Sequence, residues 1–308
     1  MAILAVFIAL VIEQLRPLQA QALVYSPLGR LSSWVLERAG NRAAQRGRLP
    51  WWLIVLATTV GAALAHAFLW DVHPTIAFAF NVAVLYWATG FSGDHQRFAD
   101  IDLALRMGEL ERARTLLGEW RGADSSAADE SEVARLAIEQ ALVSSHRNVF
   151  AVIFWFVVLP GPSGAVLYRV ARFLREAWAR QADAGFGERA SFARRAFELI
   201  DWLPVRLTAA SLSVVGDFED ALYCWRTQSM NWPDKSSAIL IAAGGGAMGL
   251  KLGMPIHQSG EIVERPEMGL GEETSADHMR GVVRLIWRAL VVCLLVLILL
   301  TLAGVAGG

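Results

Sequence analysis

Apolar residues are concentrated in a few long runs that few charged residues interrupt. Three of these runs, 51–70, 75–91 and 285–305, approach or reach the length of about 20 helical residues that a hydrocarbon core of about 30 Å requires. A fourth run, 1–13, is shorter, and it lacks the basic start and the small-residue cleavage site of a signal peptide. We expect it to be a retained first helix. The pattern therefore predicts four spanning helices near these ranges.

The segment 93–283 mixes charged and apolar positions. Recurring apolar residues predict a helix over 97–120, a turn over 122–128, and a further helix that begins in the acidic stretch 129–132. The apolar run 150–168 is broken by LPGPSG, which predicts a re-entrant helical hairpin and not a single span. No stretch shows β-strand alternation of useful length. The sequence therefore predicts an all-α fold: one polytopic integral membrane domain over 1–308, with about four spanning helices plus re-entrant and amphipathic helices.

Arginine is distributed unevenly around these runs, which predicts an orientation. The segment 14–50 carries six arginines against one acid, Glu37. Short loops rich in Lys and Arg stay in the cytoplasm. We therefore expect this loop to be cytoplasmic and both termini to lie outside. A hairpin over 150–168 keeps the arginines between 169 and 195 cytoplasmic, so that 93–283 is a cytoplasmic or re-entrant region.

The composition supports a membrane protein. Hydrophobic residues make up 55% of the 308 residues and charged residues only 19%, whereas soluble domains carry about 25% charged residues. The net charge of −1 argues against a nucleic-acid partner and leaves the lipid bilayer as the expected one. Two cysteines exclude a disulfide scaffold and a Cys-rich metal centre. No metal-ligand set stands out.

Common catalytic motifs such as GxSxG, HExxH and GxxxxGK[ST] are missing. The GGGAMG segment, 244–249, has dinucleotide-loop spacing but follows no predicted strand, so close helix packing through small residues is the better interpretation. Arg169, Arg172 and Arg175 recur on one helix face. That face could hold a phosphate or carboxylate substrate, or it could contact anionic lipid headgroups, and both interpretations stay open.

Several segments match one known family in order. They are GADSS (122–126), IEQ (138–140), the Phe-Trp, PSGA and Tyr-Arg pieces of 154–169, LPVRLT (203–208), Trp-Pro (232–233), GAMGLKLGMP (246–255) and GEIVERP (260–266). These resemble the G-R-D-T-S, I-E-S, P-G-A, I-P-A-R-L-T, G-A-L-G-x-x-L-G-G-P and G-E-x-V-E-K-P segments of the CobD/CbiB family of cobalamin biosynthesis. The chain therefore resembles that family over most of its length, and it also resembles the related AmpE branch.

The resemblance implies an enzyme of the bacterial inner membrane, an adenosylcobinamide-phosphate synthase. Such an enzyme joins aminopropanol phosphate to adenosylcobyric acid, a corrinoid, by amide ligation, with ATP and Mg²⁺. No residue receives a catalytic role. The candidate substrate-binding residues are Asp124, Glu139, Arg169, Arg172, Asp201, Arg206 and Glu264.

Each main candidate also has a structural alternative. Asp124 could cap a helix, and Glu139 could pair with Arg135 at i, i+4. We expect Pro204 to start a helix and Arg206 to be partly buried, where Asp201 or Glu198 could pair with it.

Departures from the synthase pattern keep a second function open. Polar positions of the synthases are replaced here in 142–144, 172–176 and 197–198, and 12–16 and 199–206 are closer to AmpE. The alternative is an AmpE-like, non-catalytic inner-membrane regulator of envelope or β-lactamase induction signalling. A third possibility is a family member that binds a small anionic ligand without a known reaction.

Overall fold

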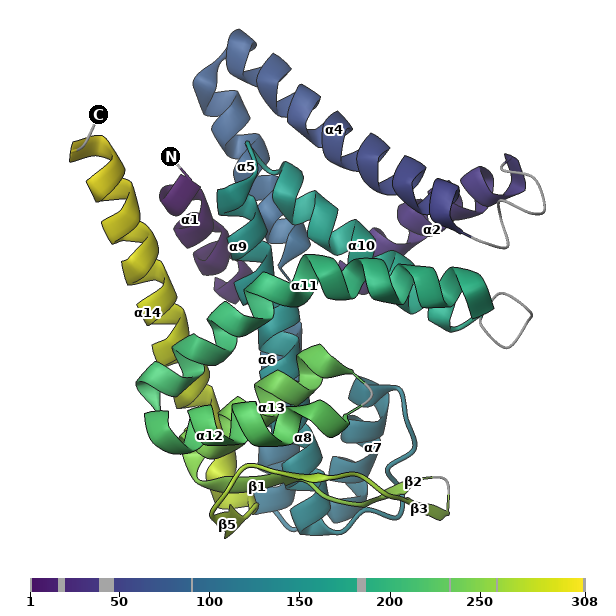
Figure 1. The fold of residues 1–308 in the computed structure, drawn as a ribbon, viewed down its shortest axis with the longest axis vertical. Coiled ribbons are helices and arrows are strands. Elements are labelled where there is room, and N and C mark those ends of the chain that lie inside the picture. The colour runs from purple at the N-terminus through teal and green to yellow at the C-terminus, as the bar shows by residue number, and fades with distance from the viewer. Residues whose placement is uncertain are drawn as a thin grey trace. The chain divides into compact units, whose positions relative to one another are not determined.

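The computed structural model describes residues 2–15, 20–38, 47–89, 91–181, 187–232, 234–258 and 260–306 (Figure 1). The chain folds as two compact units, each made of two stretches of sequence. Unit 1 comprises Met1–Gly90 and Asn148–Trp202, and unit 2 comprises Phe91–Arg147 and Leu203–Gly308. Three of the six arginines of segment 14–50, namely Arg16, Arg42 and Arg46, and Pro233 of segment 232–233 lie outside the described part. The single-domain organisation stays a prediction.

The described residues of unit 1 form helices joined by turns and contain no strand. Helix α4 packs on α2, α5 and α10, and α1 packs on α5. Most of α4 presents its apolar side chains outward, since only Pro50, Trp51, Ile54 and Val55 are buried. The helices are α1 (Ala2–Leu15), α2 (Ala20–Arg38), α4 (Arg48–Val72), α5 (Pro74–Ala88), α9 (Ala151–Val158), α10 (Ser163–Ala179) and the first part of α11 (Gly187–Val215).

A helical hairpin in unit 1 confirms the break predicted at LPGPSG. Helix α9 ends at Val158 and α10 begins at Ser163, and the two helices pack against each other (Figure 1). The close packing depends on Gly164, because a Cβ there would overlap the carbonyl oxygen of Trp155. Re-entry of this hairpin into a membrane stays a prediction.

Unit 2 combines helices with short strands. Helix α8 contacts α6, α7, α13 and α14, and α12 lies along α13 (Figure 1). The elements are α6 (Phe91–Arg106), α7 (Leu110–Arg121), α8 (Glu130–Ser145), the π-helical turn η1 (His146–Phe150), which continues into unit 1, the second part of α11, α12 (Phe218–Gln228), η3 (Ser229–Asn231), α13 (Lys235–Met248), η4 (Ala276–His278) and α14 (Met279–Ala306).

Five short strands follow α13, although the sequence predicted none. They are β1 (Leu250–Gly253), β2 (Ile256–Gln258), β3 (Glu261–Val263), β4 (Glu267–Met268) and β5 (Glu272–Glu273). Strand β1 pairs with β4 antiparallel and with β5 parallel, and β2 pairs with β3 as an antiparallel hairpin. Strands of two to four residues are too short to show alternation, which explains the wrong prediction.

The glycine-rich segment before these strands packs as predicted. Added Cβ atoms at Gly244 and Gly246 would meet Leu142 of α8 and the Asp220 carbonyl of α12 at 2.5 Å. Helices α8 and α12 therefore approach α13 at positions where a side chain has no room.

Three helix boundaries differ from the prediction. The helix expected over 97–120 is two helices, because Gly108 takes a left-handed φ of 73° between α6 and α7. Segment 14–50 is not a plain loop, since it contains α2. Pro204 does not start a helix but lies inside α11. By contrast, α8 begins in the acidic stretch 129–132 as expected, and its N-cap is Asp129, whose carboxylate accepts from the N–H of Glu132 at 2.7 Å.

Four helices are long and apolar enough to cross a membrane: Arg48–Val72, Pro74–Arg106, Glu130–Val158 and Ala276–Ala303, the second of which includes residue 90, outside the described part. Three of them overlap the runs predicted at 51–70, 75–91 and 285–305. The fourth was missed, and the run at 1–13 forms only the shorter apolar helix α1. It was missed because the polar residues at 144–148 interrupt the apolar pattern, while the helix continues through them as η1. The all-α fold class is confirmed, and the orientation stays a prediction.

Candidate functional site

A buried ion pair lies at the centre of the candidate site in unit 2. Glu139 of α8 is 5% exposed, and both of its carboxylate oxygens accept hydrogen bonds from the guanidinium of Arg265, at 2.9 and 3.0 Å. This bidentate geometry is the strongest form of such a pair. The Glu139 carboxylate also accepts from the backbone N–H of Gly253 at 2.9 Å.

Arg265 also binds the backbone between β1 and β2. Its guanidinium donates to the carbonyl oxygens of Gly253 at 2.7 Å and Met254 at 3.1 Å. It stacks over the ring of Trp232, 4.8 Å from the ring centroid. The ion pair therefore fixes the turn after β1 against α8.

One face of α8 holds the chain after this turn. Glu132, Arg135 and Glu139 recur at i, i+3 and i+7, so they share that face. Arg135 donates to the carbonyl of Pro255 at 2.9 Å. The Glu132 carboxylate accepts from the backbone N–H of His257 at 2.7 Å and lies 2.8 Å from its Nδ1. The pairing of Glu139 with Arg135 considered from the sequence is replaced by the pair with Arg265.

Arg121 brings a further guanidinium toward this cluster from the last turn of α7. Burial lowers the pKa of Arg121, the attraction of Glu139 and Glu132 opposes that shift, and the repulsion of Arg265 adds to it. Across the described ranges, no hydrogen bond involves the Arg121 side chain. Arg121, Arg135 and Arg265 were all missed as candidates, although Arg265 lies within the family-like segment 260–266.

The turn after β1 carries an unusual backbone conformation. Gly253 has a φ of 72° and Met254 a φ of 62°, and Met254 is the one residue other than glycine with a positive φ in the described ranges. The left-handed region costs an ordinary residue about 1–2 kcal/mol. A following proline restricts Met254 further. The similar family segment has glycine at this position.

Replacing Met254 with glycine is expected to stabilise the protein by about 0.5–1 kcal/mol. The gain is the relief of left-handed strain, reduced by the greater chain entropy of glycine in the unfolded state. Met254→Val is the matched control and should destabilise by about 1 kcal/mol, because a β-branched residue tolerates a positive φ poorly. Thermal unfolding of both variants in detergent measures the difference. Equal destabilisation by both substitutions would contradict the presence of backbone strain at Met254.

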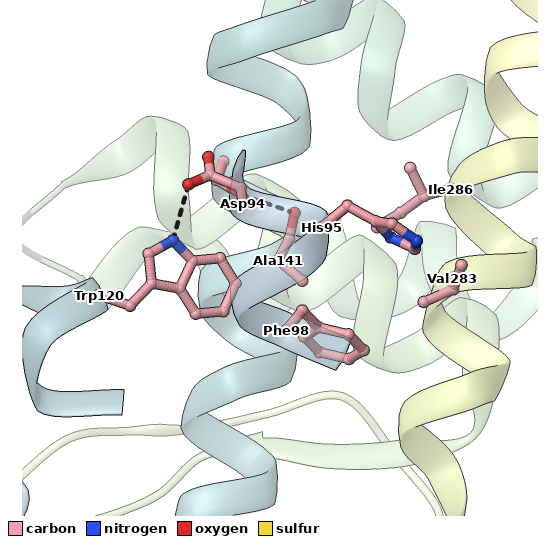
Figure 2. A pocket seen from close by; sticks show the side chains of 8 residues that line it. Asp94, His95, Phe98, Trp120, Ala141, Val283 and Ile286 are labelled. Carbon is pink, nitrogen blue, oxygen red and sulfur yellow. Dashed lines mark hydrogen bonds between the residues drawn. The ribbon is translucent and has the colours of Figure 1, made fainter. Parts of the chain in front are cut away.

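A small cavity of about 20 Å³ also lies in unit 2 (Figure 2). Figure 2 shows Trp120 donating to Asp94, at 2.9 Å, on one side, and His95 beside Val283 and Ile286 of α14 on the other. The cavity has room for about one water molecule. It is too small for a substrate, and its lining residues belong to the packing of α6, α7, α8 and α14.

Unit 1 contains a second polar cluster. Arg169 and Arg172 of α10 both donate to the side-chain oxygen of Asn148, at 2.9 and 2.6 Å, and Arg172 also binds Glu176 at 2.7 Å. Arg175 lies over the ring of Phe197, 5.0 Å from its centroid. The predicted arginine face is thus present, and these contacts hold its side chains within unit 1.

The other predicted residues have different surroundings. Asp201 is fully buried in unit 1 and accepts from the hydroxyl of Tyr168 at 2.9 Å. Arg206 is half-buried in unit 2, and burial lowers its pKa. Asp124 is exposed and accepts from the N–H of Ser126 at 3.0 Å, which makes it a turn residue and not the cap of α8. Glu264 is exposed.

The seven candidates therefore divide between the units. Arg169, Arg172 and Asp201 belong to unit 1, and Asp124, Glu139, Arg206 and Glu264 belong to unit 2. Within unit 2, Glu139 is the candidate whose hydrogen bonds join the family-like segments 246–255 and 260–266. A single pocket built from all seven stays a prediction.

The residues of the Glu139 cluster do not fit Mg²⁺ as they are arranged. Mg²⁺ needs carboxylate oxygens that are available for coordination. Those of Glu139 accept from Arg265 and Gly253, and those of Glu132 lie against His257. Within the described part of the chain, no three His, Cys, Asp or Glu residues are placed to hold a metal ion.

Comparison with known proteins gives a consistent result. Residues 2–286 match the family described as CobD/Cbib protein. The chain is 34% identical to the cobalamin biosynthesis protein CobD of Stutzerimonas stutzeri, over 96% of each chain. It is 35% identical to the protein of the same name from Chromobacterium violaceum, over 70% of this chain and 69% of the relative. It is 24% identical to the cobalamin biosynthesis protein CbiB of Salmonella typhimurium, over 84% and 83%. No solved structure matches the chain.

Proposed function

Because this chain belongs to the CobD/CbiB family, we propose that it is a cobalamin biosynthesis protein of the bacterial inner membrane. Its reaction is the attachment of aminopropanol phosphate to adenosylcobyric acid through an amide bond. The relatives are named for cobalamin biosynthesis, which favours this function over the AmpE-like regulator. The four apolar helices supply the membrane association.

One observation carries the proposal. Three family-like segments that are far apart in the sequence meet at one buried ion pair. Glu139 comes from segment 138–140, Gly253 from 246–255 and Arg265 from 260–266. A buried pair is a weak source of stability compared with well-packed apolar residues. A positioning role at a binding site is therefore the better explanation for this convergence.

The chemistry of the reaction fits a site rich in guanidinium groups. Amide ligation forms a C–N bond between a substrate amine and a carboxylate carbon, and one carboxylate oxygen leaves; it would leave within inorganic phosphate if ATP activates the carboxylate. Both proposed substrates bring negative charge, one as a phosphate and one as a carboxylate. Arginine side chains in a partly buried site can bind and orient such anions. The need for ATP and Mg²⁺ rests on the resemblance alone and stays a prediction.

Complementation tests the proposed function. The full-length chain, expressed in a bacterial strain that lacks its own synthase, should restore growth that depends on cobalamin when cobyric acid is supplied. Arg112→Gln should restore growth equally, because the Arg112 side chain is exposed, pairs with Glu109 and lies outside the ion pair and the candidate residues. Absence of growth, with normal protein levels in the membrane, would contradict the proposal. An altered β-lactamase induction in place of growth would favour the regulator.

A further inference from the structure

The cluster around Glu139 contains more guanidinium groups than buried carboxylates. Three arginines, Arg121, Arg135 and Arg265, share it with two buried glutamates, Glu132 and Glu139. Arg121 lies in the last turn of α7, which packs against α8, the helix that carries Arg135 and Glu139. The charges of Glu139, Arg265 and Glu132 act on both Arg121 and Arg135, and that of Asp129 acts on Arg135 as well. The five side chains therefore form one cluster in which the guanidinium groups outnumber the buried carboxylates.

The glutamates of this cluster are already occupied. Glu139 accepts three hydrogen bonds from Arg265 and Gly253. Glu132 accepts from the backbone N–H of His257 and lies against its ring nitrogen. The neighbouring acid Asp129 is exposed and accepts from the N–H of Glu132, capping α8. Neither Arg121 nor Arg135 has a carboxylate within ion-pair distance in the described part of the chain.

One arginine of the cluster keeps a buried hydrogen-bond donor without an acceptor, and a second makes no hydrogen bond to the described residues. Arg135 is only 6% exposed, and its Nε–H has no hydrogen-bond partner among the described residues, while its Nη2 binds the Pro255 carbonyl. The half-buried Arg121 side chain makes no hydrogen bond within those same residues. A buried cation without an anion is costly, so such an arrangement points to a ligand that completes it.

We propose that Arg121 and Arg135, next to Arg265, bind a phosphate monoester. The planar guanidinium fork matches the oxygens of a phosphate group and can bind two of them at once. Arg121 and His257 are the partly open members of the cluster, so an anion can reach it from solvent. That the ligand is the phosphate of aminopropanol phosphate rests on the proposed function, whereas the anion site itself does not.

Binding of inorganic phosphate and of 1-amino-2-propanol phosphate to the purified full-length protein in detergent tests the site. Both should raise the thermal unfolding midpoint in a saturable way, because a ligand that binds the folded state stabilises it. Arg121→Gln should weaken both affinities at least tenfold. The ligand-free midpoint of this variant should stay equal or rise, because the substitution removes a desolvated charge.

The matched control is Arg112→Gln on the same helix. Arg112 is 59% exposed in its side chain and pairs with Glu109, so its loss should leave phosphate binding unchanged. Equal phosphate affinities of the Arg121→Gln variant and the native protein, or no saturable phosphate binding at all, would overturn the site. A loss of binding in both variants would also overturn it, since this indicates a general effect of net charge.

A lipid headgroup is the competing source of the same chemistry. The thermal unfolding midpoint of the delipidated protein, measured with added short-chain phosphatidic acid, distinguishes a lipid headgroup from a soluble phosphate. If phosphatidic acid stabilises the native protein but not the Arg121→Gln variant, and the two soluble phosphates have no effect, the site binds a lipid headgroup. That result would overturn the proposal of a soluble phosphate ligand. Phosphate binding through Arg121 in a chain that fails to complement the synthase-null strain would retain the site and reject the proposed function. Complementation without phosphate binding through Arg121 would retain the proposed function and reject the site.

Discussion

Replacing Arg265 with glutamine is expected to lower the free energy of unfolding by about 3–5 kcal/mol, because it leaves the charge of Glu139 buried without its partner. The same substitution removes two hydrogen bonds to the carbonyls of Gly253 and Met254, so the turn after β1 loses its attachment to α8. Loss of complementation should follow. Thermal and denaturant unfolding in detergent measure the stability.

Two controls make this prediction specific. Glu264 is the neighbour of Arg265 and is exposed, so Glu264→Gln should change stability by less than about 0.5 kcal/mol. Combining Arg265→Gln with Glu139→Gln should recover part of the lost stability, because the double variant no longer buries an unpaired charge. Additive losses in the double variant would show that the two side chains act independently, contrary to the bidentate pair.

Replacing Gly164 with alanine is expected to destabilise unit 1 by about 3 kcal/mol or more and to reduce the folded protein recovered from membranes. An added Cβ would overlap the backbone carbonyl of Trp155, and a backbone atom cannot rotate away as a flexible side chain can. Helices α9 and α10 must then separate, which is the most severe form of overpacking.

The control for this substitution is Gly61→Ala on α4. A Cβ at Gly61 meets nothing within 4 Å, so alanine there should be neutral or should stabilise the helix by about 0.5–1 kcal/mol. Both variants exchange a helical glycine for alanine in the same unit, so the difference between them isolates the contact with Trp155. A Gly164→Ala protein as stable as the Gly61→Ala protein would contradict the close packing of the hairpin.

The helical fold was predictable because its signals are local. An apolar run of the right length predicts a span by itself, and LPGPSG marks the break between α9 and α10 wherever the rest of the chain lies. The span through η1 was missed because a π-helical turn accommodates polar residues such as His146 without ending the helix. The strands after α13 were missed because their pairing depends on contacts between segments and not on a local pattern.

The candidate site was only partly predictable for the same reason. Glu139 was found through the family-like segment around it, but its partner was expected four residues away on α8. The partner is instead Arg265, 126 residues further along the chain. In the segment 260–266 the acidic Glu264 was preferred, yet it is exposed, and its basic neighbour Arg265 faces the site. Sequence spacing does not reveal which of two adjacent charges points inward when both flank short strands.

The distance along the chain between Glu139 and Arg265 also sets an order of events during synthesis. At about 5–20 residues per second, the ribosome needs roughly 6–25 s to extend the chain from one residue to the other. During that interval the apolar helix Glu130–Val158 has already been made, with the Glu139 carboxylate still lacking its guanidinium. Until the segment that carries Arg265 emerges, this carboxylate must therefore find its hydrogen bonds elsewhere, from water or from other groups. A chain that stops within the interval retains, in an apolar helix, an acid without the guanidinium that compensates it in the finished protein.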